Sequence, residues 1–431
     1  MQAVIMAGGK GTRLEALTKG ELPKPMVPIL NKPLLEWQLE QLKRYSITRI
    51  TMIVGHLHQK IIDYFGNGSK FGCKIDYIIE EKPLGTAGAF YFLKDKLVDE
   101  NFLLVFGDVF FDIDLNKMIE FHNKKNAEAT LFAHPNSHPF DSDLIKSDID
   151  GKVIAFDSKN NVRNYWYDNC VNAGMYVLNK SICSKIQEPV KTDFEKEILA
   201  VMAENGENIY AYKSPEYIKD VGTIERITKT IEEIKSGFIA SRNLEFKQRA
   251  VFMDRDGTIN KLKGFLDNEN DFELEDCAVS AIGKINTSGM LAIVITNQPV
   301  VARGQCSIED VENIHNKMKT LLGNKGVYLD DVIFCPHHPD KGFPEENPAY
   351  KIDCECRKPK TGMIMEAVSK YNIDLSKSFM IGDTTMDLEL GRRAGVKTCL
   401  VLTGEAGNDK KFSKESDFVA ENLEKAVDII L

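Results

Sequence analysis

The chain has 431 residues, a hydrophobic fraction of 43%, a charged fraction of 28% and a formal net charge of −9. This length is too great for one ordinary hydrophobic core, so two or three domains are expected in a chain of globular composition. The acidic balance argues against general nucleic-acid binding, and the lack of any run of about 18 apolar residues argues against a membrane span.

The cysteine count and the opening residues bear on the cellular compartment. Nine cysteines are scattered along the chain, and an odd count in a chain of this size does not suggest a disulfide framework. The sequence opens on a strand-like pattern and not on a basic stretch followed by an apolar signal core. We therefore expect a protein of the reducing cytoplasm, and leave open whether it forms a homo-oligomer.

Short apolar runs alternate with amphipathic stretches, which predicts an α/β fold. In the first half we expect a helix at 34–45 and strands at 3–7, 49–54, 74–79 and 102–106. Further along, the pattern becomes richer in strands, at 129–133, 153–156 and 172–178, and 224–234 is expected to be a helix. This order predicts an α/β domain with a β-rich later part, and the motif resemblance described below implies a Rossmann-like fold with a mixed sheet.

A second α/β unit starts after a stretch of weak periodicity at 235–249. Its expected strands are 250–253, 290–296, 332–335 and 378–381. The domain prediction is a first domain at 1–238, a linker at 239–248 and a second domain at 249–431. The two halves share no visible repeat.

A glycine-rich loop directly after the first strand is the first candidate site. Glycines there allow the backbone to approach an anion closely, so that amide N–H groups can bind phosphates. Arg13 and Lys24 add positive charge, and Lys24 is stiffened by a proline on either side. A second small-residue loop, 84–88, suits a flat base. Such a loop can be an ordinary turn, but the combination indicates a nucleoside triphosphate site.

Two carboxylates accompany these loops. Asp108 follows the apolar strand that precedes it, where an α/β sheet normally places its ligand. Asp220 lies near another expected strand end. Together they could hold Mg²⁺ against a triphosphate. The simpler alternative is that each aspartate caps a turn.

Residues 1 to about 235 resemble sugar-1-phosphate nucleotidylyltransferases, because they contain the motifs of that family in the same order. The segments that carry the resemblance are GGKGTRL, PKP, LGTAG, GD, VNAG and DVGT. The resemblance implies that Arg13 and Lys24 position the triphosphate for attack by a sugar 1-phosphate that is already anionic. It implies a magnesium ion on Asp108 and Asp220. It also implies nucleotide contacts at Ala7, Gly8, Gly9, Gly11, Thr12, Gly85, Thr86 and Asp108, and sugar contacts at Asn172, Gly174, Lys159 and Glu195. Phe156-Asp157-Ser158-Lys159 departs from the family, because it keeps only the lysine of the usual Glu-Lys pair.

Glu80 bears on the choice of base. It lies five residues before Gly85, where thymidylyl relatives tend to carry glutamine. An ionised carboxylate only accepts hydrogen bonds, and guanine presents paired donors whereas adenine presents a ring-nitrogen acceptor. GTP is therefore the predicted donor; a solvated glutamate is the alternative.

Asp254 and Asp256 lie on one tight loop after the first strand of the second unit. This spacing lets one carboxylate act as nucleophile while the other serves as acid and then base. Thr296, Lys358 and Asp383 follow in order, and offer a hydroxyl and a cation to a phosphoryl group and a carboxylate to a metal. The four pieces resemble the motifs of haloacid dehalogenase-type phosphatases.

That resemblance implies an aspartyl phosphate on Asp254 and proton transfer by Asp256. It also implies Mg²⁺ on Asp254, Asp383 and the Asp256 carbonyl. Asp387 is expected to support this site without binding the metal.

A cysteine and histidine cluster follows the third expected strand of the second unit. Cys335, His337, Cys354 and Cys356 make a closed tetrahedral set for Zn²⁺. His338 is an alternative fourth ligand, and unrelated thiols are the simpler alternative. Because Cys356 lies two residues before Lys358, we expect a structural zinc ion that orders the loop carrying Arg357 and Lys358.

Residues 249–431 resemble D-glycero-D-manno-heptose 1,7-bisphosphate 7-phosphatases. Besides the cysteine and histidine cluster, the segments that carry this resemblance are DGTIN, TNQ, ARG and CRKP. Histidinol-phosphate phosphatases share much of this pattern. Arg303 and Arg357 are the candidates for binding the distal phosphate, and Asn297 is a further substrate contact. Pro299-Val300 replaces the family's usual Ser-Gly after Asn-Gln.

The two resemblances together predict a fused enzyme. It would remove the 7-phosphate of a heptose 1,7-bisphosphate and then join the heptose 1-phosphate to GMP from GTP, releasing pyrophosphate. One alternative is a hexose (mannose or glucose) 1-phosphate nucleotidylyltransferase fused to a phosphatase for another monoester, such as histidinol phosphate. Another is a first half that only senses sugar nucleotides.

Overall fold

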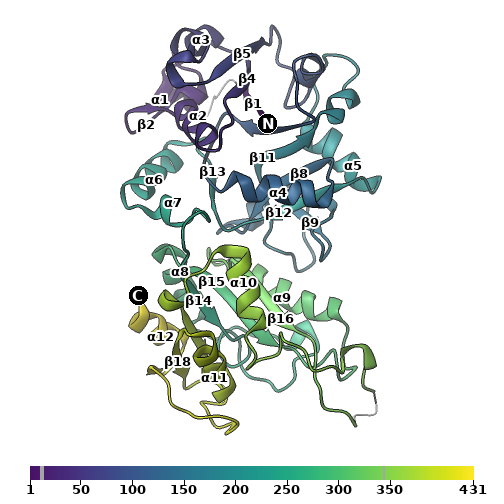
Figure 1. The fold of residues 1–431 in the computed structure, drawn as a ribbon, viewed down its shortest axis with the longest axis vertical. Coiled ribbons are helices and arrows are strands. Elements are labelled where there is room, and N and C mark those ends of the chain that lie inside the picture. The colour runs from purple at the N-terminus through teal and green to yellow at the C-terminus, as the bar shows by residue number, and fades with distance from the viewer. Residues whose placement is uncertain (10–13, 343–344) are drawn as a thin grey trace. The chain divides into compact units, whose positions relative to one another are not determined.

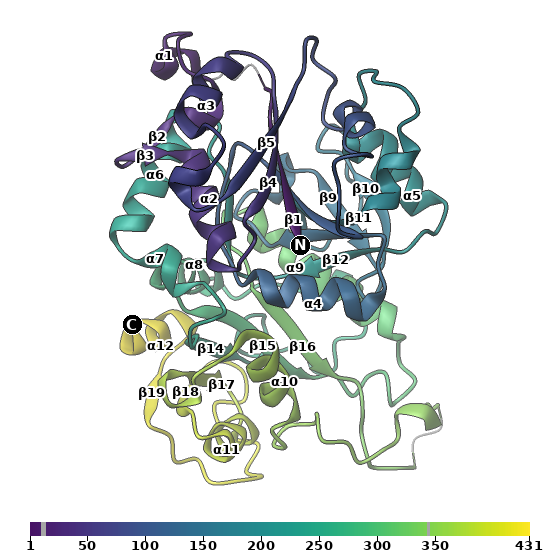
Figure 2. The ribbon, with the colours of Figure 1, turned by 45° about the horizontal axis from the view of Figure 1, so that its top comes forward.

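The computed structural model describes residues 1–9, 14–342 and 345–431. The chain divides into two compact units (Figures 1 and 2). The first comprises residues 1–134, 145–157 and 171–243, and the second comprises 135–144, 158–170 and 244–431. Among the described residues, no helix combines the length and the apolar character needed to cross a membrane.

The first unit is built on a mixed sheet that contains nine strands within the described residues, in the order β10-β9-β11-β6-β1-β4-β5, with β8 beside β11 and β12 beside β8. β1 is parallel to both β4 and β6, whereas β11 is antiparallel to β6 and β8. Ala3, Val4 and Ile5 of β1 are fully buried, as expected for a central strand covered on both faces. The strands are β1 (Gln2–Ala7), β4 (Arg49–Val54), β5 (Lys74–Ile79), β6 (Asn101–Phe106), β8 (Ala129–His134), β9 (Leu144–Ser147), β10 (Val153–Asp157), β11 (Val171–Asn179) and β12 (Ile209–Lys213).

Helices cover this sheet with their apolar faces. Leu35 and Leu39 of α2 share one buried cluster with Ile61 and Phe65 of α3 and with strand β1. α4 lies along β8 and β12 (Figure 2). The helices are α1 (Glu15–Thr18), α2 (Leu34–Arg44), α3 (His58–Phe65), α4 (Leu115–Lys125), α5 (Ala200–Glu204), α6 (Ile224–Lys235) and α7 (Phe238–Ser241), and two small ribbons are β2 (Pro28–Ile29) with β3 (Lys32–Pro33) and β7 (Val109–Asp112) with β13 (Tyr217–Asp220).

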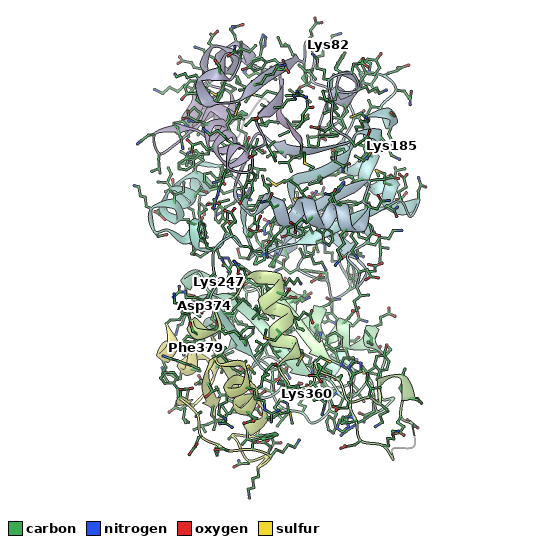
Figure 3. All side chains as sticks on the ribbon, viewed as in Figure 1. Lys82, Lys185, Lys247, Lys360, Asp374 and Phe379 are labelled. Atoms are coloured by element: carbon green, nitrogen blue, oxygen red, sulfur yellow. The ribbon has the colours of Figure 1, made fainter. Side chains whose placement is uncertain are left out.

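The second unit contains a sheet whose described strands are all parallel, in the order β16-β15-β14-β17-β18-β19. α8, α9 and α12 contribute buried residues to one core cluster, and α10 contributes Met363, Ile364 and Ala367 to another. Helices thus cover both faces, as a parallel sheet requires. The elements are β14 (Ala250–Met253), α8 (Ala278–Ser288), β15 (Leu291–Asn297), α9 (Ile308–Gly323), β16 (Asp331–Cys335), α10 (Gly362–Tyr371), β17 (Phe379–Gly382), α11 (Thr385–Ala394), β18 (Lys397–Val401), β19 (Phe418–Ala420) and α12 (Leu423–Ile430). Figure 3 labels Asp374 and Phe379, which mark the turn into β17.

The second unit also includes two segments that interrupt the first unit in sequence, 135–144 and 158–170. The Tyr167 amide donates to Thr320 Oγ1 at 3.0 Å, and the Thr320 hydroxyl donates back to the Tyr167 carbonyl at 3.2 Å. Lys319 Nζ donates to Asp168 Oδ1 at 2.8 Å. These reciprocal bonds attach the second segment to α9.

The expected strands and the two expected helices are present, each end within one residue of the prediction. The stretch expected as a linker is more ordered than its weak periodicity suggested. Ile239 of α7 is buried, Arg242 donates to the Pro215 carbonyl, and Asn243 donates to Asp112 at 2.6 Å. The first part of that stretch is therefore packed into the first unit, which ends at residue 243.

Candidate active sites

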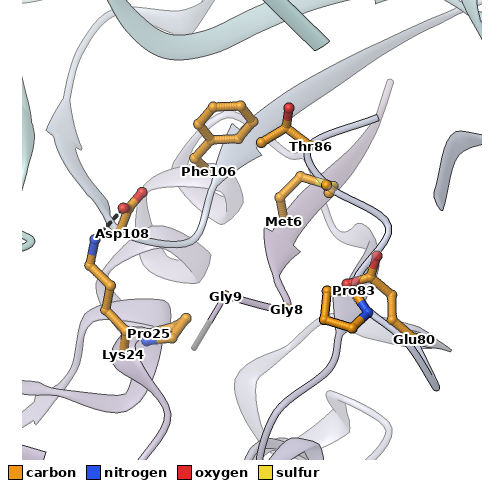
Figure 4. Close-up of a pocket in the computed structure, with 11 residues that line it drawn as sticks. Met6, Gly8, Gly9, Lys24, Pro25, Glu80, Pro83, Thr86, Phe106 and Asp108 are labelled. Carbon is orange, nitrogen blue, oxygen red and sulfur yellow. Dashed lines mark hydrogen bonds and ion pairs between the residues drawn. The ribbon is translucent and has the colours of Figure 1, made fainter. Parts of the chain in front are cut away.

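The first unit contains a cavity of about 310 Å³ beyond the carboxyl ends of β1 and β6. This is the edge at which open α/β sheets bind ligands. Figure 4 shows Lys24 and Asp108 at one side, Glu80 and Pro83 at the other, and Gly8 and Gly9 between them. The described residues that line the cavity are Met6, Gly8, Gly9, Lys24, Pro25, Glu80, Pro83, Gly85, Thr86, Phe106 and Asp108. Ala7 is buried at the end of β1. Gly11, Thr12 and Arg13 lie outside the described residues.

Lys24, Asp108 and Asp220 converge at one side of this cavity. Lys24 Nζ forms an ion pair with Asp108 Oδ2 and lies 3.5 Å from Asp220 Oδ1. The antiparallel pairing of β13 with β7 brings the two aspartates together, and the Val221 amide donates to the Asp108 carbonyl at 2.9 Å. Two carboxylates beside an open cavity are the donor set that Mg²⁺ uses when phosphates and water supply its other ligands. These residues therefore fit the expected ion.

Glu80 faces the other side of the cavity. Its Oε1 accepts a hydrogen bond from the Leu84 amide at 3.2 Å, and burial raises the pKa of its carboxyl group. A Cβ atom at Gly8 would collide with the Glu80 carboxylate. Gly85 has φ +76°, and a Cβ atom there would meet the Thr192 backbone. Gly85 therefore requires glycine, because of both its backbone conformation and its backbone contact, whereas a side chain at Gly8 would require the Glu80 carboxylate to move.

The expected sugar-binding residues are only partly brought together. Asn172 Nδ2 donates to the Tyr176 hydroxyl at 2.8 Å, and that hydroxyl donates to Glu195 Oε1 at 2.9 Å. Gly174, between Asn172 and Tyr176, has φ +73°. Lys159 lies on segment 158–170 of the second unit, where its amide donates to Asp143. No single unit therefore holds Lys159 together with Asn172 and Glu195.

In the second unit, a buried lysine joins two of the acidic motif residues. Lys358 Nζ lies 2.8 Å from Asp254 Oδ2 and 2.7 Å from Asp387 Oδ1. Asp254, Asp383 and Asp387 are buried, and each offers an oxygen atom within 4.8 Å of the others. The parallel strands β14 and β17 place Asp254 and Asp383 at the same edge of the sheet.

This acidic group has the properties of a cation site. Burial, followed by the neighbouring carboxylates, raises the pKa of Asp254 to about 7 and that of Asp383 to about 8. Asp383 Oδ1 is buried without a hydrogen-bond partner, although its Oδ2 accepts from the Glu405 amide at 2.7 Å. Both oxygens of Asp387 are already engaged, one by Lys358 and the other by the Thr384 N-cap. Asp254 and Asp383 therefore fit Mg²⁺ better than Asp387 does.

Asp256 is held by side chains that the sequence did not single out. The fully buried Arg255 donates through Nη2 to both Asp256 oxygens at 2.9 Å, and Gln298 and Asn260 add bonds at 2.9 and 3.0 Å. Burial raises the pKa of Asp256, but the Arg255 charge and these donors outweigh it and leave that pKa lowered. Its side chain is not part of the acidic group, and the metal contact expected of Asp256 is through its backbone carbonyl.

The remaining motif residues of the second unit surround Lys358 and its loop. Thr296 is the last but one residue of β15, and its hydroxyl group accepts a hydrogen bond from Gln298 at 3.0 Å. Asn297 binds the Lys358 backbone, accepting from its amide at 3.0 Å and donating to its carbonyl at 3.3 Å. Arg303 stacks on Phe265, 3.9 Å from the ring centroid, and Arg357 donates to the His337 carbonyl at 2.9 Å. The asparagine expected to contact substrate is thus engaged in holding the lysine loop.

Cys335, His337, Cys354 and Cys356 form one cluster whose ligand atoms lie within 4.8 Å of one another. The sulfur atoms are 3.2–3.5 Å apart, close to the roughly 3.7 Å edge of a tetrahedron with Zn–S bonds of 2.3 Å. Hydrogen bonds, the largest from Cys335, lower the pKa of Cys356 to about 5. His338 instead accepts from the Asp340 amide. The donor set therefore fits a structural metal ion, with His337 as the nitrogen ligand. Near the cysteines in the chain, Lys360 forms ion pairs with Asp353 and Glu355; Figure 3 labels Lys360.

Comparison with known proteins gives relatives for each half. The Nucleotidyl transferase family matches residues 2–237, and the HAD-hydrolase-like family matches residues 355–426. A D-glycero-α-D-manno-heptose 1-phosphate guanylyltransferase from Aneurinibacillus thermoaerophilus is 35% identical over 54% of this chain and 99% of its own length. A D-glycero-β-D-manno-heptose-1,7-bisphosphate 7-phosphatase from Pasteurella multocida is 36% identical over 41% of this chain and 93% of its own.

A crystal structure of HddC from Yersinia pseudotuberculosis is 28% identical, with a TM-score of 0.48, over 54% of this chain and 99% of the other. The two sequence relatives each align over almost their whole length, with different halves of the chain. The chain therefore belongs to the nucleotidyl transferase family through its first half and to the HAD-like phosphatases through its second.

Proposed function

We propose that this chain is a bifunctional enzyme of nucleotide-activated heptose biosynthesis in the cytoplasm. The second unit would hydrolyse D-glycero-D-manno-heptose 1,7-bisphosphate at C7, and the first would join heptose 1-phosphate to GMP from GTP. One observation carries this proposal. The relatives of the two halves are named for neighbouring reactions of one sugar. Relatives of the second half are named as 7-phosphatases of the β or of the α anomer of heptose 1,7-bisphosphate. The α-anomer 7-phosphatase yields the sugar phosphate that the named guanylyltransferase uses.

In the phosphatase, Asp254 is the nucleophile. One of its oxygens attacks phosphorus and forms an aspartyl phosphate, while the bond to the sugar C7 oxygen breaks and that oxygen takes a proton from Asp256. Asp256 must take up this proton before the step, because its pKa is lowered in the free site. Asp256 then takes a proton from water, which attacks the aspartyl phosphate and releases inorganic phosphate and free Asp254. Lys358, 2.8 Å from Asp254, stabilises the negative charge of the nucleophile and of the phosphoryl oxygens.

Metal ions would assist both units. Asp254, Asp383 and the Asp256 carbonyl would hold Mg²⁺ in the phosphatase, and Asp108 with Asp220 would hold it in the transferase. The ion supplies positive charge that offsets repulsion between anionic groups. The thiols and His337 would hold Zn²⁺ as a structural ion. Because Arg357 donates to the His337 carbonyl, this ion would also fix the loop that presents Arg357 and Lys358.

In the transferase, the phosphate of heptose 1-phosphate attacks the α-phosphorus of GTP, and pyrophosphate leaves. No side-chain base is needed, since the nucleophile is already an anion. Lys24, beside Asp108, would bind the triphosphate end, and Glu80 would accept hydrogen bonds from guanine at the opposite side of the cavity (Figure 4). The α anomer is proposed, following the named guanylyltransferase relative.

The direct test supplies purified full-length chain with each anomer of heptose 1,7-bisphosphate, Mg²⁺ and one of four nucleoside triphosphates, and identifies the products by mass. The proposal predicts phosphate and pyrophosphate release, with GDP-heptose formed from GTP. Phosphate release without any sugar nucleotide, or preference for a hexose 1-phosphate, would reject the heptose assignment of the first unit.

A further inference from the structure

Tyr176 lies between two side chains expected to contact the sugar. It is fully buried on β11, and its ring meets the rings of Phe194 and Phe106 edge-on, with centroid distances of 5.1 and 5.8 Å. Phe106 in turn lines the cavity. The Tyr176 ring is therefore immobilised behind the cavity wall, with its hydroxyl group directed at Asn172 and Glu195.

The hydrogen bonds of this hydroxyl have a fixed direction. An amide NH₂ group can only donate and a carboxylate can only accept, so Asn172 donates to Tyr176 at 2.8 Å and Tyr176 donates to Glu195 at 2.9 Å. Burial, followed by the charge of Glu195, raises the pKa of Tyr176, which keeps its proton in place. The hydroxyl group therefore sets the orientation of both neighbours.

Two irregular backbone segments meet at this hydroxyl group. The register of β11 against β8 shifts between Asn172 and Tyr176, where Gly174 has φ +73° and its amide donates to Asn172 Oδ1 at 3.4 Å. Glu195 lies in a π-helical turn, 194–199, where Asp193 Oδ1 accepts from its amide at 3.1 Å. Strand bulges and π-helical turns commonly redirect side chains at functional sites. Here both redirect a polar group to Tyr176.

We propose that Tyr176 is a positioning residue for sugar recognition in the first unit. It does not touch the sugar; it fixes Asn172 and Glu195 as a pair that does. This inference rests on the proposed function only in requiring that the unit binds a sugar 1-phosphate. Removing the hydroxyl group would leave Asn172 without its acceptor and Glu195 without this donor, while Glu80 and Gly85 at the cavity stay unchanged.

The test compares full-length Tyr176→Phe, Glu195→Gln and the double variant with the unmodified chain. Pyrophosphate release is measured against heptose 1-phosphate at saturating GTP, and against GTP at saturating sugar. We expect Tyr176→Phe to raise the KM for the sugar about tenfold, the scale of one lost hydrogen bond, with the KM for GTP changed less than about twofold. The double variant should lose less than the sum of the two single losses, because Tyr176 acts in part through Glu195.

Tyr64→Phe is the matched control, since it also removes a tyrosine–glutamate hydrogen bond, of 2.7 Å to Glu36, at the exposed surface of the same unit. It should leave both KM values unchanged. The inference is overturned if Tyr176→Phe leaves the sugar KM unchanged, raises both KM values together with a lower unfolding temperature, or adds fully to Glu195→Gln.

Failure of the proposed function gives a different result. If the unmodified chain uses another sugar 1-phosphate or another nucleotide, the heptose or GTP assignment is wrong, and the same variants test Tyr176 with the substrate found. An unmodified chain that binds no sugar 1-phosphate in calorimetric titration would overturn both proposals.

Discussion

The acidic site residues are partly exposed in the first unit and buried in the second. Asp108 and Asp220 keep 30% and 35% of their side-chain surface exposed, and Lys24 and Arg226 pair with them. Asp254, Asp383 and Asp387 are almost completely buried, and the buried Lys358 pairs with Asp254 and Asp387. An exposed pair suits a site in which the attacking group arrives with the substrate. In the buried group the pKa values of Asp254 and Asp383 are raised, and such a desolvated group suits a site in which the protein supplies its own nucleophile.

The largest expected effect is a loss of phosphate release, and it tests whether the two active sites are independent. Asp254→Asn removes the attacking carboxylate, so phosphate release from the bisphosphate should fall at least ~10³-fold. Pyrophosphate release from supplied heptose 1-phosphate and GTP should stay within about twofold. Both products are measured on one preparation, and a folded variant that loses both activities equally would show that the sites are not independent.

Lys24→Met should reduce pyrophosphate release by ~10²-fold, because it removes the cation held between the carboxylates and the triphosphate end of the cavity. Phosphate release should be unchanged. Lys32→Met is the control, since Lys32 forms a lysine–glutamate ion pair with the half-exposed Glu40. Equal losses in the two lysine variants would contradict a special role for Lys24.

Glu80→Gln should change the preference for the base more than the rate. A glutamine adds a donor where the carboxylate only accepts, so the ratio of kcat/KM for GTP over dTTP should fall about tenfold. Competition between the two nucleotides, read by product mass, measures the ratio. An unchanged ratio would mean that Glu80 does not read the base.

The smallest expected effect is the release of protons when Mg²⁺ binds to the second unit. Without metal, the pKa values of Asp254 and Asp383 are about 7 and 8. Both are raised, so the protonated forms are populated at neutral pH, and Mg²⁺ should displace these protons. Proton release on Mg²⁺ binding should therefore be larger at pH 6.5 than at pH 9, and the affinity should weaken as the pH falls below about 8. Calorimetry in two buffers of different ionisation enthalpy measures the number of protons released. This proton release should be largely lost in Asp383→Asn.

Much of this site geometry follows from the sequence, for a simple reason. Gly8, Asp108, Asp254 and Asp383 each follow an apolar strand, and parallel strands bring their carboxyl ends to one edge. The strand ranges therefore predicted that these residues lie at the carboxyl edges of their sheets, and the motif resemblances indicated which of them act together. The cysteine and histidine spacing likewise predicted the cluster found in the structure.

The rest depended on pairings that no local pattern encodes. Asp220 reaches Lys24 because β13 pairs with β7. The role of Tyr176 depends on a strand bulge, and apolar periodicity marked it only as a core residue. Arg255 sits between two motif aspartates, but its burial against Asp256 could not be read from its position. Lys159 was expected to contact the sugar because of a short motif, and this stays a prediction; the grouping of its segment with the second unit could not be read from that motif.

That division has a practical consequence for dissecting the protein. The chain crosses from one unit to the other at 134/135, 144/145, 157/158, 170/171 and 243/244, so no single cut yields two complete pieces. A gene fragment starting at residue 244 would encode α9 without the segment whose Tyr167 is bonded to Thr320. An expression design for an isolated phosphatase must therefore supply that partner or replace the surface it covers.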